Sequence, residues 1–211
     1  MLVKNLFDCP RIIKGTLFEF LRTLPYAVRD HSRYAAVIIA ILLRDSTAET
    51  ESESVMAAYW GAYLHDIGKS TFLKTLIMCP EKRTPTQEAI YSNWQRISCE
   101  MFERYGTELH QTVECNAITA GIIALSDEKD DGAFSDSFTG PNRYHQAYYA
   151  ANYMAYQIVG VDKRRVVKSK IRPAIRAALS FCQERGYEEI GKELAVKKRE
   201  ITCALEKATL L

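Results

Sequence analysis

The stretch AAYWGAYLHDIGKS, residues 57–70, decides the fold that this sequence predicts. Its first half is almost entirely apolar, which is typical of a buried helix, and that helix is expected to run from Val55 to about Asp66. Gly68 allows the backbone to leave regular helical geometry directly afterwards. The adjacent imidazole of His65 and carboxylate of Asp66 can then reach one divalent ion. Lys69 stands just beyond the glycine, where its ammonium group can meet a phosphate oxygen.

Histidines are few, and only one other can join this doublet. His31 opens a second apolar helix, expected over residues 31–44, where it can either cap the helix or bind an ion. The doublet also has a purely structural interpretation, as a hydrogen-bonded pair in the core. His110 and His145 have no convincing partners, and we expect them on the surface or satisfied in the core.

Helical periodicity continues along the chain, and no alternating β pattern competes with it. Further helices are expected over about 15–24, 87–105, 108–125, 142–158, 161–183 and 187–207, with a short apolar element over 72–78. No internal repeat and no Gly/Ser linker divides the chain. The sequence therefore predicts one all-α domain over residues 1–211.

Composition excludes several classes of protein. Of the 211 residues, 47% are hydrophobic and 26% are charged, and a net charge of +2 gives no overall field that would favour nucleic acid or an anionic membrane. The six cysteines are scattered without a CxxC pair, and the N-terminus lacks the pattern of a secretory signal. The longest apolar run, residues 34–43, is too short to cross a bilayer. We expect a soluble, cytoplasmic protein with free thiols and no membrane partner.

The sequence resembles the HD superfamily of metal-dependent phosphohydrolases, and within it the HD-GYP branch, whose members hydrolyse cyclic di-GMP in bacterial signalling. Three features carry the resemblance: His31 at a helix start, the string LHDIGK at residues 64–69, and STFLKTLIMCPEKRTPTQE at residues 70–88, which keeps Pro80, Lys82, Thr84 and Pro85 in the register of the family. The resemblance is clear over residues 25–105. It implies an HD-domain helical bundle with metal ligands His31, His65 and Asp66, and with Asp66 and Lys69 in the catalytic centre.

The second half of the family's metal site has no match. Trp94 stands where the family has a further histidine, Ala27 stands where some members have a glutamate, and Asn152 is the best counterpart of the last aspartate ligand. The family's His-His pair and Gly-Tyr-Pro loop correspond to the histidine-free SDEKDDGAFSD at residues 126–136. The resemblance therefore implies a site that lacks donors for two metal ions.

One ion remains chemically reasonable. His31, His65 and Asp66 can supply three ligands, with water or a loop carboxylate as the fourth. The candidates for that fourth place are Asp127, Asp130, Asp131 and Asp136. The ligand types do not distinguish among Fe, Mn, Zn, Ni and Mg, and a site without any metal is the alternative.

A basic run and a series of tyrosines complete the candidate features. The run DKRRVVKSKIRPAIR, residues 162–176, is the strongest local departure from charge balance, and it opens the basic C-terminal helices expected over 161–207. In HD-GYP relatives, basic residues soon after the last ligand contact substrate phosphates, which makes Arg164, Arg165 and Lys168 candidates beside Lys69. The run could equally bind a nucleic acid backbone or an acidic partner, or form a solvated helix face. We interpret the tyrosines chiefly as core and interface residues, with stacking on a base as the alternative: Tyr144, Tyr148, Tyr149, Tyr153 and Tyr156.

Two functions of different classes are therefore expected. The first is a degenerate HD-GYP-like domain that acts as a regulatory module and binds a protein partner, a nucleotide or a cyclic dinucleotide, with the two-metal phosphodiesterase site lost. The alternative is a one-metal HD phosphohydrolase acting on a nucleotide or another phosphate ester, in which Lys69 neutralises developing charge. A metal-free nucleotide sensor that uses the basic run is a third hypothesis. Nucleic acid is not favoured as a partner, and a homo-oligomer is left open.

Overall fold

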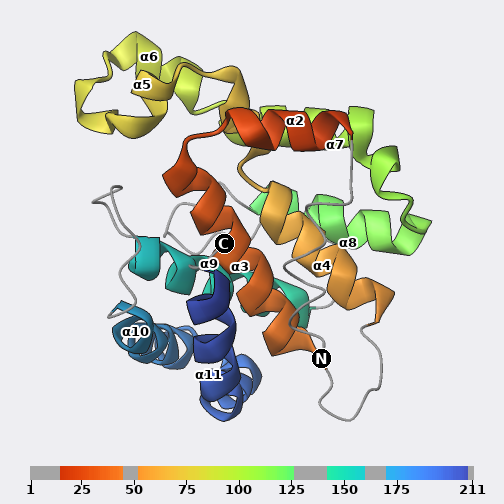
Figure 1. The fold of residues 1–211 in the computed structure, drawn as a ribbon, viewed down its shortest axis with the longest axis vertical. Coiled ribbons are helices and arrows are strands. Elements are labelled where there is room, and N and C mark those ends of the chain that lie inside the picture. The colour runs from red at the N-terminus through yellow and green to blue at the C-terminus, as the bar shows by residue number, and fades with distance from the viewer. Residues whose placement is uncertain (1–14, 45–51, 126–141, 160–169, 209–211) are drawn as a thin grey trace.

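The computed structural model describes residues 15–44, 52–125, 142–159 and 170–208, and every regular element within these ranges is a helix (Figure 1). The all-α prediction is thus confirmed. The α-helices are α2 (Thr16–Thr23), α3 (Tyr26–Leu43), α4 (Glu53–Leu64), α5 (Lys74–Met78), α6 (Pro85–Tyr91), α7 (Trp94–Tyr105), α8 (Val113–Ala124), α9 (Asn142–Val159), α10 (Ile171–Glu184) and α11 (Glu188–Ala208). Three 3-10 turns connect them: η1 (Ile67–Thr71), η2 (Pro80–Lys82) and η3 (Gly106–Leu109).

Helix α3 runs through the middle of the molecule and carries the core. It packs against α4 on one side and against α9 and α11 on the other (Figure 1). All residues from Tyr34 to Leu43 are at most 7% exposed, which explains why the sequence there is apolar on every face. Each fully buried Val, Leu or Ile of this run contributes about 1.5–3 kcal/mol of transfer free energy.

Helix α4 is the second buried helix, and it brings the doublet to the core. Its N-terminus is capped by the hydroxyl of Ser52, which accepts a hydrogen bond from the amide of Val55 at 3.2 Å. The helix therefore begins two residues earlier than the expected start at Val55. Helix α8 crosses α4 closely at Gly61, where a Cβ atom would lie 2.7 Å from Cβ of Ile122.

Three further helix boundaries differ from the sequence prediction. Helix α3 begins at Tyr26, directly after Pro25, so His31 lies in its second turn and does not cap it. The helix expected over 87–105 is two helices, because the Asn93 side chain bonds back to the carbonyls of Ala89 and Ile90 and ends α6. Helix α8 begins at Val113 instead of Glu108, since the Thr112 hydroxyl caps it by accepting from the Cys115 amide.

The segment from α5 to α6 stands apart from the helical body, at the outer end of the molecule in Figure 1. It is held together by its own turns, including a capping box in which Thr84 and Gln87 exchange hydrogen bonds at the start of α6. None of the described helices combines the length and the hydropathy needed to cross a bilayer. Five cysteines of the described ranges are free thiols, as expected: Cys79, Cys99, Cys115, Cys182 and Cys203.

Candidate metal centre

The three predicted metal ligands come together in the fold. His31 comes from α3, and His65 and Asp66 follow the last residue of α4. One ligand atom from each lies within 4.8 Å of the other two, and no other group of three or more His, Cys, Asp or Glu side chains in the described residues could hold an ion in this way. His65 and Asp66 are 2% and 3% exposed, and His31 is half-buried. The prediction that these residues could form one metal site is confirmed.

The turn that carries the doublet is fixed by a close approach between two backbones. Gly68 donates its amide hydrogen to Oγ of Ser98 at 2.8 Å, and a Cβ atom on Gly68 would lie only 2.0 Å from the carbonyl oxygen of Trp94. Gly68 is therefore required because α7 passes directly over η1. The expectation that glycine serves here to release the helix is corrected, since α4 already ends at Leu64.

The rings of the two histidines are neutral and oriented. Nδ1 of His65 donates to the carbonyl of Ala62 at 2.7 Å, which leaves the lone pair of Nε2 free, 3.4 Å from Oδ1 of Asp66. Burial lowers the pKa of His65, and burial together with the neighbouring His65 lowers the pKa of His31 to about 4. Both imidazoles are thus in the neutral form that binds metal ions.

Asp66 is the only carboxylate of the group, and it is ionised. Burial alone would raise its pKa, but His65, Lys69 and His31 outweigh that effect and lower the pKa to about 2. Nζ of Lys69 lies 2.6 Å from Oδ1 of Asp66 and 4.0 Å from the centre of the Trp94 ring. Lys69 therefore serves as an internal counter-ion, held by the carboxylate and by the face of the indole.

Trp94 and Asn152, which the sequence resemblance aligns with metal ligands, both line the larger of the cavities at the site. Oδ1 of Asn152, on α9, accepts a hydrogen bond from Nε2 of His31 at 2.8 Å, and an amide oxygen can also serve as a neutral metal ligand. Trp94 offers only an N–H donor and no ligand atom. Two imidazoles, one carboxylate and one amide oxygen fit a single divalent ion. A second ion would lack donors among the described residues.

Two cavities open on the group, and four residues line both of them: His31, Asp66, Lys69 and Tyr156. One, of about 440 Å³, extends between α7, α9 and α10, and aromatic rings dominate its wall. These rings belong to Trp94, Tyr149, Tyr153, Tyr156 and Phe181. The tyrosines of α9 were predicted to be chiefly core and interface residues. The core part of that prediction is confirmed for Tyr148, which is fully buried, whereas Tyr156 is 53% exposed beside the cavities.

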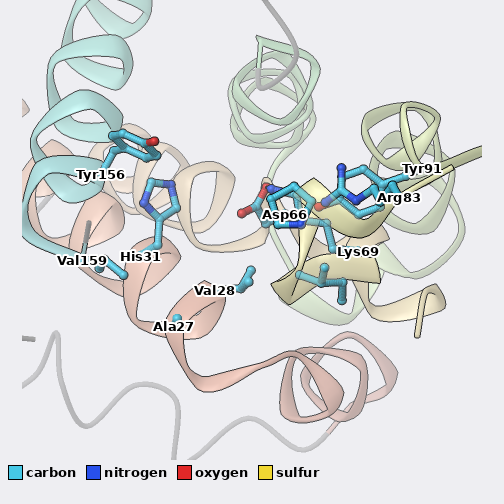
Figure 2. Close-up of a pocket in the computed structure, with 11 residues that line it drawn as sticks. Ala27, Val28, His31, Asp66, Lys69, Arg83, Tyr91, Tyr156 and Val159 are labelled. Atoms are coloured by element: carbon cyan, nitrogen blue, oxygen red, sulfur yellow. The ribbon is translucent and has the colours of Figure 1, made fainter. Parts of the chain in front are cut away.

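The other cavity, of about 290 Å³, extends towards α5 and α6 (Figure 2). Ala27 and Val28 of α3 and Val159 of α9 form an apolar wall, and Arg83 and Tyr91 lie on the far side. Sequence reasoning missed both Arg83 and Tyr91. Their signal was no stronger than one basic and one aromatic residue in a polar stretch.

Other candidates lie elsewhere. The phosphate-binding candidates Arg164, Arg165 and Lys168 fall outside the described residues, and so do the loop carboxylates Asp127, Asp130, Asp131 and Asp136. His110 is exposed at the end of η3 and His145 is buried in α9, as expected for residues without a role in the site.

Comparisons with known proteins leave the family open, because no protein-family model matches the chain and neither a curated protein nor a solved structure shows significant similarity to it.

Proposed function

We propose that this chain is a degenerate HD-GYP-like domain of the HD superfamily, and that it acts as a regulatory module that binds a nucleotide or a protein partner. The observation that carries the proposal is the make-up of the site around Asp66. It combines a preformed place for one ion with Trp94 and Asn152 at the positions where a two-metal phosphodiesterase needs further ligands.

The charge balance of the site supports the same proposal. Among the described residues Asp66 is the sole carboxylate of the converging ligands, and Lys69 already neutralises it at 2.6 Å. Two divalent ions bring four positive charges, and one buried carboxylate does not balance them. The two-metal hydrolysis typical of the HD-GYP branch is therefore not part of the proposed function.

A one-metal phosphohydrolase is the second candidate, because the ligands are oriented before any ion binds. His31, His65 and Asp66 would hold the ion, with the oxygen of Asn152 as a weak fourth ligand. A divalent ion held there supplies Lewis-acid polarisation of a phosphoryl oxygen. Lys69 would neutralise the charge that develops on the phosphoryl group.

One experiment separates the two candidates. The purified chain is loaded in turn with Mn, Fe(II), Zn, Ni and Mg, the bound metal is counted, and hydrolysis of bis(p-nitrophenyl) phosphate is measured. The same measurements are made on His65→Ala and Asp66→Ala, and on His110→Ala as a control that keeps the site intact. We expect one ion or less per chain, lost in the first two variants only, and no turnover above that of the free ion.

Turnover by the loaded protein that disappears in His65→Ala and Asp66→Ala and persists in His110→Ala would overturn the regulatory module and establish the hydrolase. Absence of bound metal under every loading condition would overturn the hydrolase.

A further inference from the structure

Among the described residues near the site, Arg83 is the one buried cation to which the proposed function gives no role. It follows η2 in the turn between α5 and α6, and its side chain is only 7% exposed. Its guanidinium carbon lies 3.6 Å from the centre of the Tyr91 ring. A guanidinium so far removed from water is costly unless its N–H groups are paired.

Part of that pairing is structural. Nε donates to the carbonyl of Leu76 at 2.6 Å, and Nη1 donates to both carboxylate oxygens of Glu88 at 2.9 and 3.2 Å. These bonds fix the turn between α5 and α6 and orient the fork of the guanidinium. Glu88 is 57% exposed and does not line the cavity, so the carboxylate holds Arg83 from the solvent side.

The opposite side of Arg83 faces the cavity of about 290 Å³ that also contains His31, Asp66 and Lys69 (Figure 2). In this view Arg83 and Tyr91 lie on one side and His31 and Tyr156 on the other, with Asp66 between them. Burial raises the pKa of the Tyr91 hydroxyl, so it stays protonated and can donate a hydrogen bond. The cavity thus offers a guanidinium, a phenol and the ammonium of Lys69 to a single ligand, which is the donor set of an anion site.

We propose that the Arg83 end of this cavity binds a second anionic group of the ligand, so that the site selects phosphate compounds with two phosphate groups over those with one. This inference rests on the proposed function, in which the chain binds a nucleotide, and it places one phosphate of that ligand beside Lys69. The ligand class is a diphosphate or bisphosphate ester: one phosphate meets Lys69 next to the triad, and the other meets Arg83 and Tyr91. The bonds that anchor the turn use Nε and Nη1 of Arg83. They do not explain why the guanidinium lies in a cavity that also reaches the triad of His31, His65 and Asp66.

The test uses inorganic pyrophosphate and orthophosphate as probes. Their affinities for the whole chain are measured by calorimetry at fixed ionic strength, first without metal and then with the ion that loads the site. We expect wild type to prefer pyrophosphate by at least about tenfold, the usual size of one charge-assisted hydrogen bond. In Arg83→Gln that preference should vanish while orthophosphate affinity stays unchanged. The control Arg96→Gln removes an exposed arginine of α7 that pairs with Glu100 and lines neither cavity, and it should bind as wild type does.

A second pair of variants guards against a trivial folding defect. Glu88→Gln keeps the cation and removes its outer partner, so pyrophosphate should bind at least as tightly as to wild type. The double variant Arg83→Gln/Glu88→Gln removes the cation without leaving Glu88 unpaired, and it should again lose the preference. The inference is overturned if both Arg83 variants, folded by circular dichroism, keep the wild-type preference, or if wild type binds pyrophosphate no better than orthophosphate.

Failure of the proposed function is distinguishable from failure of this inference. If the preference for pyrophosphate does not depend on Arg83, but Lys69→Gln still weakens orthophosphate binding, only the second anion subsite is refuted. Pyrophosphate binding that depends on Arg83 but not on Lys69, Asp66 or metal refutes the phosphate at the triad, and it overturns the two-phosphate inference as well.

Discussion

Replacement of Gly68 by alanine is the most direct test of how the site is built. The new Cβ atom would lie 2.0 Å from the carbonyl oxygen of Trp94 and 2.6 Å from the amide nitrogen of Ser98, and real Cβ atoms essentially never come closer than 3.0 Å to such atoms. Helix α7 and the turn η1 must therefore separate by about 1 Å, since both obstacles are backbone atoms that have no rotamer to change. The separation also stretches the buried hydrogen bond from Gly68 to Oγ of Ser98.

The expected loss of stability follows from these two effects. Overpacking costs about 1–3 kcal/mol, and a buried donor left without its acceptor costs a further 1–3 kcal/mol. The free energy of unfolding should thus fall by roughly 4 kcal/mol, a large fraction of the total for a domain of this size. Urea denaturation followed by circular dichroism measures the change, and bound metal should fall with it because Asp66 and Lys69 sit on the displaced turn.

Gly191→Ala is the matched control. That glycine lies within α11, where a Cβ atom would make only an ordinary contact of 3.5 Å with Cβ of Cys182. Alanine is the better helix former, so this variant should be more stable than wild type by up to about 1 kcal/mol. A cost of less than about 1 kcal/mol for Gly68→Ala would refute the close approach of α7 and η1, because no steric account of a 2.0 Å contact is compatible with so small a loss.

Three further results are expected. Asn152→Asp should raise the affinity for a divalent ion at least about tenfold in metal competition titrations, because a charged carboxylate replaces a neutral oxygen 2.8 Å from Nε2 of His31. An unchanged affinity would place Asn152 outside the ligand set. For the metal-free protein, the free energy of unfolding should fall as the pH falls from 6.5 to about 4, because the fold lowers the pKa of His31 to about 4 and the unfolded chain takes up the proton first. His31→Gln should flatten this part of the pH profile. Above pH 6.5 the histidine is neutral in both states, and its contribution vanishes. Lys197→Met should lower the free energy of unfolding by about 2 kcal/mol in urea titrations, since the buried ammonium bonds the carbonyls of Leu42 and Arg44 at the end of α3, and a neutral result would show these bonds to be dispensable.

The sequence was informative wherever a local pattern reports burial. The apolar runs of α3 and α4 predicted both central helices, and the resemblance to the HD superfamily grouped His31 with His65 and Asp66 in one site. The start of α3 was misplaced because His31 was expected to open the helix, whereas the helix begins directly after Pro25, and proline is common at helix starts.

Features that depend on residues far apart in the chain were not readable. Glycine is needed at position 68 because the backbone of α7, at Trp94 and Ser98, passes directly over it. These residues lie far beyond Gly68 in the sequence, and no local pattern encodes the contact. Arg83 is one arginine in a polar turn, and only the fold gives it a buried place beside Lys69. Asn152 is an exception, because the resemblance to a family suggested its position and the structure brings it to His31.

The pairing of Lys69 with Asp66 has a consequence for when the protein becomes folded. In many small metalloproteins the ion is part of the folding reaction, because the ligands do not form a site in the unfolded chain. Here the buried carboxylate of Asp66 already has a counter-charge from the same chain, the ammonium of Lys69 at 2.6 Å. Folding and metal loading are then separate events, so the supply of metal would set how many molecules are loaded and leave the amount of folded protein unchanged.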